Sequence, residues 1–170
     1  MGSETIFPAR DNREAWAVKR WEVDPLLTEI HNALYELGVK AKIQGFFETS
    51  CAIFLVMQQP ENEWFSIMEI YQKICILYHV AFDAIDPRIR NVIKRIWKRN
   101  REGLSRMAGR RLERRPTPRE FIEIMRRFVA SRLEGPAKDA LEKWQCSPDF
   151  GASANIGRHE PWNAGKWTRY

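Results

Sequence analysis

The stretch "ENEWFSIMEIYQKICILYHVAFDAID", from Glu61 to Asp86, decides the fold class of this chain. Asn62 can cap its start, and the acids on either side of Asn62 favour a helix N-terminus through the helix dipole. From Trp64 to Ile85 the segment is apolar almost all round. About 22 residues without a turn signal favour a helix over a buried strand. The sequence therefore predicts one continuous helix here, at the centre of a helical core.

Two helices are predicted upstream of this segment. In "DPLLTEIHNALYELG", residues 24–38, Asp24 can cap the helix, Pro25 suits its first turn and Gly38 suits its exit. His31 is expected on the polar side of this helix. A second helix is predicted over about residues 40–58, ended by Pro60, with a C-terminal half apolar enough to be buried.

Three helices are predicted downstream. Asp86 and Pro87 mark the start of a basic helix of roughly 40 Å, bent near Gly103 or continuous, which ends in "RRPTP" at residues 114–118. Thr117 can cap the following helix, and a short helix reaches about Trp144. The prediction is an all-α fold, a compact bundle of about six helices with an irregular C-terminal tail.

Charge divides the chain unevenly. Residues 1–145 are predicted to form one helical domain, and residues 146–170 an aromatic and basic tail. Within the domain, residues 1–87 hold 7 Lys and Arg against 13 Asp and Glu, a net charge of −6. Residues 88–132 hold 16 against 4, a net charge of +12. A basic working surface on an acidic body is one explanation, and mutual neutralisation of the two halves is the other.

Composition limits the compartment. Three cysteines in 170 residues argue against a disulfide framework and for a reducing environment. No secretory leader is apparent, and the longest apolar run, Cys51 to Met57, is far too short to span a membrane. We expect a cytoplasmic protein, with the nucleus as the alternative, and no membrane partner.

The basic helix carries the functional prediction. Like charges at i,i+4 repel one another in a helix, and each such pair costs a few tenths of a kcal/mol. Six pairs of this kind are expected here: Arg90–Lys94, Lys94–Lys98, Arg95–Arg99, Arg106–Arg110, Arg110–Arg114 and Arg111–Arg115. Phosphate binding is the commonest use of such a field, because counterion release favours multiple cation contacts.

Nucleic acid is therefore the predicted partner, and a solvated or internally paired helix face is the alternative. The predicted phosphate contacts are Arg95, Lys98, Arg99, Arg106, Arg110, Arg111, Arg114 and Arg115. Folding alone can account for the cations up to Trp97. The arginines beyond Gly103 have the weakest structural explanation, so we expect the partner there first.

The kind of nucleic acid is less sharply indicated. No zinc-finger spacing, RNP-type motif or GXXG loop in an RNA-binding context is present, and no helix-turn-helix is evident. We expect sequence-independent backbone binding, with RNA favoured over DNA, by an oligomer that coats or sequesters RNA. A viral or phage origin would suit this role. The alternatives are a capsid- or matrix-type assembly protein and a helical adaptor for an acidic protein.

The tail interleaves cations with aromatic side chains. Trp162, Trp167 and Tyr170 could stack on bases, or pack against a neighbouring helix or subunit. Together with the strongly apolar residues 43–82, this pattern favours a homo-oligomer.

Catalysis and metal binding lack support in the sequence. No nucleophile elbow, P-loop, HExxH or carboxylate pair is found. Cys75 and His79 have the i,i+4 spacing of a metal pair, which Cys51 and Cys146 could complete, but buried structural residues explain them better. The chain is predicted to have no metal, no cofactor and no enzymatic activity.

Overall fold

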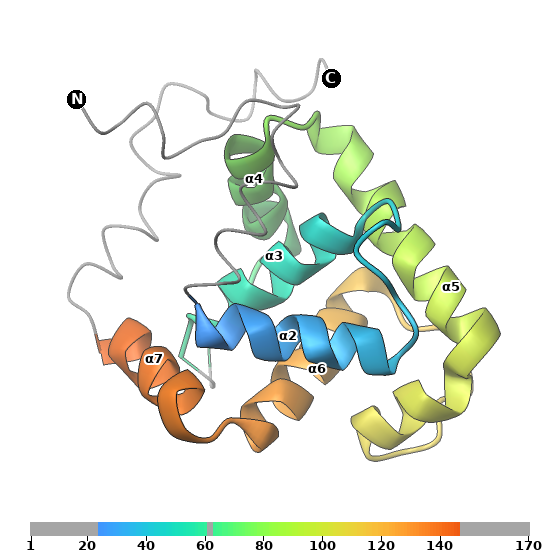
Figure 1. Cartoon of the computed structure of the whole chain (residues 1–170). Coiled ribbons are helices and arrows are strands. Elements are labelled where there is room, and N and C mark those ends of the chain that lie inside the picture. The colour runs from blue at the N-terminus through green and yellow to red at the C-terminus, as the bar shows by residue number, and fades with distance from the viewer. Residues whose placement is uncertain (1–23, 61–62, 147–170) are drawn as a thin grey trace.

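Six helices and no strand make up the residues that the computed structural model describes, which are 24–60 and 63–146 (Figure 1). The helices are α2 Pro25–Glu36, α3 Phe46–Met57, α4 Ile67–Tyr78, α5 Phe82–Ala108, α6 Pro118–Arg132 and α7 Gly135–Cys146. The predicted all-α class is confirmed. None of the helices in this part of the chain is both long and apolar enough to cross a membrane.

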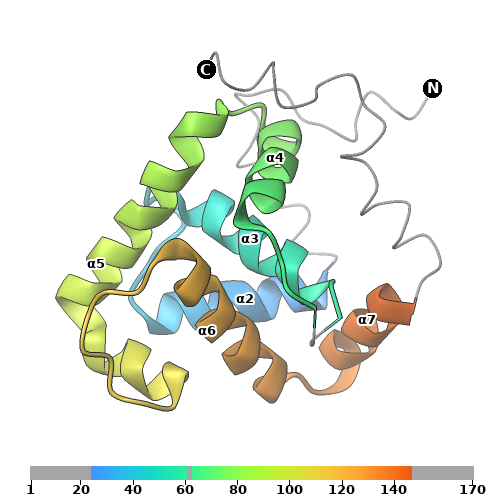
Figure 2. The same cartoon turned by 180° about the vertical axis from the view of Figure 1, so that it is seen from behind.

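Helix α3 lies at the centre of the bundle. It contacts α2, α4, α5 and α6, and the other helices surround it in both views (Figures 1 and 2). Ten of its twelve residues are buried. The prediction that residues 61–86 form the central helix was wrong, because α3 is the helix that four others enclose.

Helix α2 begins as its sequence predicts. The Asp24 carboxylate accepts a hydrogen bond from the backbone N–H of Leu26, at 3.0 Å. The expectation for His31 was wrong, since its side chain is only 2% exposed and stacks on Phe46 with ring centroids 5.0 Å apart. Burial lowers the pKa of His31 to about 3, so the imidazole is neutral in the folded protein.

The predicted helix over residues 61–86 is interrupted by a turn. Helix α4 ends at Tyr78, His79 has a left-handed φ of 51°, and α5 begins at Phe82. Val80, inside the turn, is only 3% exposed. An apolar turn residue can be buried as well as a helical one, so the apolar run conceals the break.

Helix α6 has the predicted start. Thr117 accepts from the backbone N–H of Glu120, and the Glu120 carboxylate accepts from the backbone N–H of Thr117, which completes a capping box. Helix α6 packs on α3 and α5, and α7 packs on α2. The bundle thus holds α5 along one side, where its outer face is exposed (Figure 1).

Candidate nucleic-acid interface

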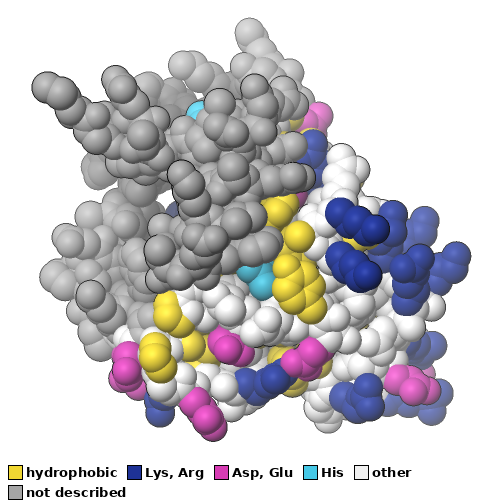
Figure 3. Space-filling view, viewed as in Figure 1, with side chains coloured by type: hydrophobic (Ala, Val, Ile, Leu, Met, Phe, Trp, Pro, Cys, Tyr) yellow, Lys and Arg dark blue, Asp and Glu magenta, His cyan; other side chains and the backbone are white. Residues whose placement is uncertain are grey.

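The first half of α5, residues 82–99, has one buried and one basic face. Its buried side chains, each at most 1% exposed, are Ile85, Ile89, Val92, Ile93 and Ile96. Its exposed cations are Arg90, Lys94, Arg95, Lys98 and Arg99. Lys and Arg side chains gather over this edge of the molecule in the space-filling view (Figure 3).

Of the exposed cations on this face, Arg90 alone forms an ion pair within the described part of the chain. Arg90 Nε lies 2.5 Å from Asp86 Oδ2 one turn earlier. Within residues 24–60 and 63–146, no ion pair is made by Lys94, Arg95, Lys98 or Arg99. Arg90 and Lys94 were not among the predicted contacts, although the successive i,i+4 steps from Arg90 through Lys94 to Lys98 place them on the same face.

Helix α5 bends at Asn100, three residues before the predicted position. Asn100 has φ −147° and ψ 48°, its Nδ2 donates to the backbone oxygen of Glu36 at 3.2 Å, and its Oδ1 accepts from the Gly103 N–H at 3.0 Å. A Cβ on Gly103 would meet that oxygen at 2.5 Å, so a larger residue there would displace the Asn100 side chain. Asn100 therefore acts as an internal N-cap that redirects the helix.

Beyond the bend the helix continues for about two turns to Ala108, and an ordered turn follows it. Helix α5 stops at Ala108, with Gly109 in the left-handed conformation. Arg101 donates from Nε and Nη2 to the backbone oxygen of Leu112, at 3.2 and 2.7 Å, and its guanidinium lies 4.4 Å from the Trp97 ring centroid. Ser105 Oγ accepts from the Leu112 N–H.

Some arginines beyond the bend have structural roles. Arg114 makes a two-point contact with the Glu120 carboxylate at 2.6 and 3.0 Å, and Arg111 lies 3.8 Å from Glu113. Of the arginines beyond Gly103, Arg114 therefore has a clear structural role, whereas Arg106, Arg110 and Arg115 are exposed and make no ion pair with a residue that the structure describes. The i,i+4 repulsions predicted beyond Ala108 do not arise, because those residues are not helical.

The turn at residues 79–81 fixes α4 against the start of α5. Tyr71 on α4 donates its hydroxyl to Asp86 on α5 at 2.8 Å, and its ring lies 6.1 Å from that of Phe82. Burial, followed by the Asp86 contact, raises the pKa of Tyr71, so the hydroxyl stays a donor. Two packed helices joined by three residues, the second with an exposed basic face, form a helix-turn-helix arrangement.

The other predicted sites fall outside this interface. Trp162, Trp167 and Tyr170 lie outside the described residues. Cys75 is buried, and burial raises its pKa to about 12, whereas His79 lies exposed beyond the end of α4. Among the described residues no three His, Cys, Asp or Glu side chains come together as metal ligands would.

The fold and the basic face define the class as an all-α nucleic-acid-binding domain. The chain belongs to the family described as "Sporulation initiation factor Spo0A C terminal", whose model matches residues 30–129. The match runs from within α2 to within α6 and so includes the whole of α5. No solved structure matches the chain.

Family membership tests the functional predictions. The family is one of nucleic-acid-binding domains and not of enzymes, which confirms both of these predictions. It does not support the RNA target, the viral role or the homo-oligomer.

Proposed function

We propose that the protein binds duplex DNA as a helix-turn-helix domain, with the first half of α5 in the major groove. The observation that carries the proposal is the exposed cation row before Asn100, presented by a helix that a three-residue turn joins to α4. The family match supports DNA in a bacterium as the target, in place of the RNA and the virus that the sequence favoured. Such a target would place the chain at the nucleoid.

The shape of this element also favours DNA over RNA. The major groove of B-form DNA is about 12 Å wide and admits an α-helix, whereas that of A-form RNA is too deep and narrow to be read. From Arg90 to Arg99 the exposed row rises roughly 14 Å along the helix axis. One helix can therefore place several cations along the groove.

Different residues of α5 are then assigned to the base edges and to the phosphates of the DNA. In helix-turn-helix complexes the N-terminal residues of the second helix contact base edges. Arg90 and Lys94, the first exposed cations of α5, are assigned to base edges, and Arg95, Lys98 and Arg99 to phosphates on the flanking strands. Beyond the bend, Arg106, Arg110 and Arg115 reach at most a flanking phosphate, and Arg111 and Arg114 keep their glutamate partners.

Fluorescence anisotropy with matched 24-base-pair duplex DNA, duplex RNA and single-stranded DNA tests the proposal between about 50 and 200 mM salt. We expect duplex DNA to bind best, with an affinity that falls by orders of magnitude across this range, as several phosphate contacts require. Tighter binding of duplex RNA than of duplex DNA would contradict the proposal. So would the absence of DNA binding at the lowest salt.

A further inference from the structure

We propose that the loop between α2 and α3, residues 40–45, is a second DNA-contacting element. In this assignment Lys40 and Lys42 contact the sugar-phosphate backbone of a strand that flanks the groove occupied by α5. The inference rests on the proposed function, since it assumes that the first half of α5 binds DNA. It adds two contacts from a segment that lies about 50 residues before α5 in the chain.

The loop is in direct backbone contact with α5. Gly45 has φ 98°, and a Cβ built on it would lie 2.3 Å from the backbone oxygen of Arg88. Only a glycine allows the two backbones to approach so closely. Asn91 Nδ2 donates to the backbone oxygen of Gln44 at 3.3 Å, a second tie between the loop and the same stretch of helix.

A buried ion pair fixes the next residues of the chain. Arg88 Nη1 lies 2.6 Å from Glu48 Oε1, with the two side chains 17% and 5% exposed. Arg88 is thus turned into the protein and acts as a positioning residue, whereas its neighbour Arg90 faces outward. The loop and the DNA-facing half of α5 are held at three points and present their cations as one unit.

The charge of the loop suits an anionic strand. Lys40 and Lys42 are exposed, the loop has no acid, and neither lysine makes an ion pair with a residue that the structure describes. The flanking acids are engaged elsewhere, Glu36 with Arg132 at 2.5 Å and Glu48 with Arg88.

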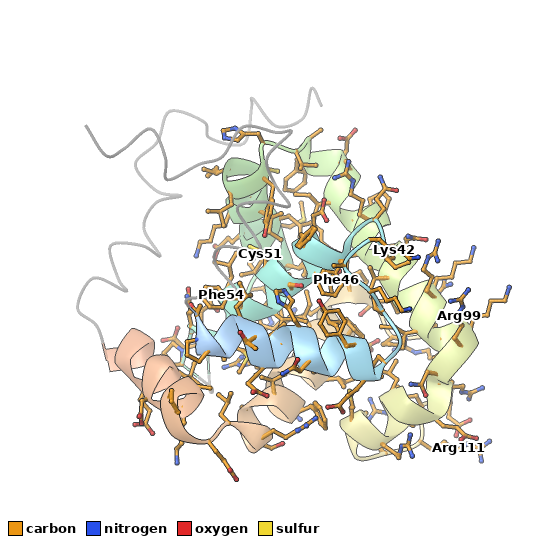
Figure 4. The ribbon with its side chains drawn as sticks, viewed as in Figure 1. Lys42, Phe46, Cys51, Phe54, Arg99 and Arg111 are labelled. Atoms are coloured by element: carbon orange, nitrogen blue, oxygen red, sulfur yellow. The ribbon has the colours of Figure 1, made fainter. Side chains whose placement is uncertain are left out.

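The loop extends the basic face rather than forming a separate one. Lys42 lies over α5 on the side from which Arg99 projects (Figure 4). In the space-filling view, Lys and Arg side chains lie close together on this side of the molecule (Figure 3). A helix inserted in a major groove has a phosphate strand on each side, and a loop packed against the flank of the helix meets one of them.

The test compares lysine variants of the full chain on one duplex DNA. The variants are Lys42→Gln, the double variant K40Q/K42Q, and Lys138→Gln as the control. Lys138 is exposed on α7, which lies at the opposite side of the bundle from α5 (Figures 1 and 2). Anisotropy is recorded at several salt concentrations, together with a thermal midpoint for each variant.

We expect the slope of log affinity against log salt to become shallower by about 2 in the double variant, because each phosphate contact contributes about 0.9. Its affinity at about 0.1 M salt should fall roughly 30- to 100-fold, with Lys42→Gln between the double variant and the parent. The control should keep the parent slope, and all variants the parent midpoint.

The outcomes separate the two proposals. If the parent chain does not bind duplex DNA, the proposed function fails and the loop assignment fails with it. If the parent binds with a steep slope that K40Q/K42Q leaves unchanged, the loop assignment is overturned while α5 keeps its role. That second outcome would leave the loop lysines to an acidic protein surface.

Discussion

The two halves of the basic segment carry the same number of cations and use them differently. Residues 87–99 hold six Lys and Arg and no acid, and residues 101–116 hold six with Glu102 and Glu113 among them. In the first half, Arg88 and Arg90 are the only cations that form an ion pair with a residue the structure describes. In the second half Arg101 binds a backbone oxygen and Arg114 binds Glu120.

This difference shows that a count of arginines does not locate a binding surface. Before Asn100 the helix is regular, its apolar stripe is buried, and the opposite face is left to solvent. After Asn100 the helix ends at Ala108 and the chain turns back, and Arg101 and Arg114 donate to a backbone oxygen and a carboxylate of that turn and of the start of α6. The first half is therefore the better candidate for the DNA contact.

The largest expected effect concerns the contact between Gly45 in the loop and Arg88 in the first half of α5. Gly45→Ala should lower the free energy of unfolding by about 3 kcal/mol, because a left-handed alanine would also strike the Arg88 oxygen. Urea denaturation measures it. Gly38→Ala is the control, since Gly38 has φ 83° with open space around its Cβ, and it should cost only about 1 kcal/mol. Equal losses of stability in the two variants would mean that the loop and α5 are not in close backbone contact at Gly45.

The next effect tests the structural role of the second half. Arg101→Gln should destabilise the protein by about 1–2 kcal/mol, because it removes the bonds to Leu112 and the contact with Trp97. Arg106→Gln, on the exposed face of the last turn of α5, should stay within about 0.5 kcal/mol of the parent. If the two variants unfold alike, the distinction between the halves weakens.

Acid should loosen the second half first. Hydrogen bonds from Arg114 and then from the Thr117 backbone lower the pKa of Glu120 to about 2, so this stabilisation is complete above about pH 4.5 and is lost as the pH falls toward 2. Glu120→Gln should cost about 0.5–1 kcal/mol at pH 7, since the contact is partly exposed, and should flatten the stability profile below pH 4.5. Glu113→Gln is the control, and an equal effect there would contradict the assignment.

The smallest effect concerns stability of the first half. Neutralising Lys94, Arg95, Lys98 and Arg99 to Gln removes three repelling i,i+4 pairs, so unfolding should become harder by a few tenths of a kcal/mol per pair at low salt. Urea midpoints at two salt concentrations measure this. A loss above about 1 kcal/mol would show that these cations also support the fold.

Much of the fold was predictable from local signals. The caps at Asp24 and Thr117 and the exit at Gly38 depend on neighbours within a few residues, and these predictions are confirmed. The turn after Tyr78 was not predictable, because it uses a left-handed His79 and a buried Val80 instead of glycine or proline. Missing that turn also concealed the helix-turn-helix.

The site was predictable only in part, because pairing depends on contacts across the fold. Periodicity predicts Arg95, Lys98 and Arg99 on a basic face, and they lie exposed there. No local pattern indicates that Arg114 contacts Glu120 around a turn, or that Asn91 donates to the backbone of Gln44. Lys42 was missed because nothing in its own neighbourhood marks it.

The most direct test compares the salt dependence of duplex DNA binding for two matched variants. One neutralises Lys94, Arg95, Lys98 and Arg99, and the other neutralises Arg106, Arg110, Arg111 and Arg115. We predict that the slope of log affinity against log salt becomes shallower by about 3 in the first variant, because three of its cations are assigned to phosphates, and by less than about 1 in the second. A larger loss in the second variant would contradict the assignment of the DNA contact to the first half of α5.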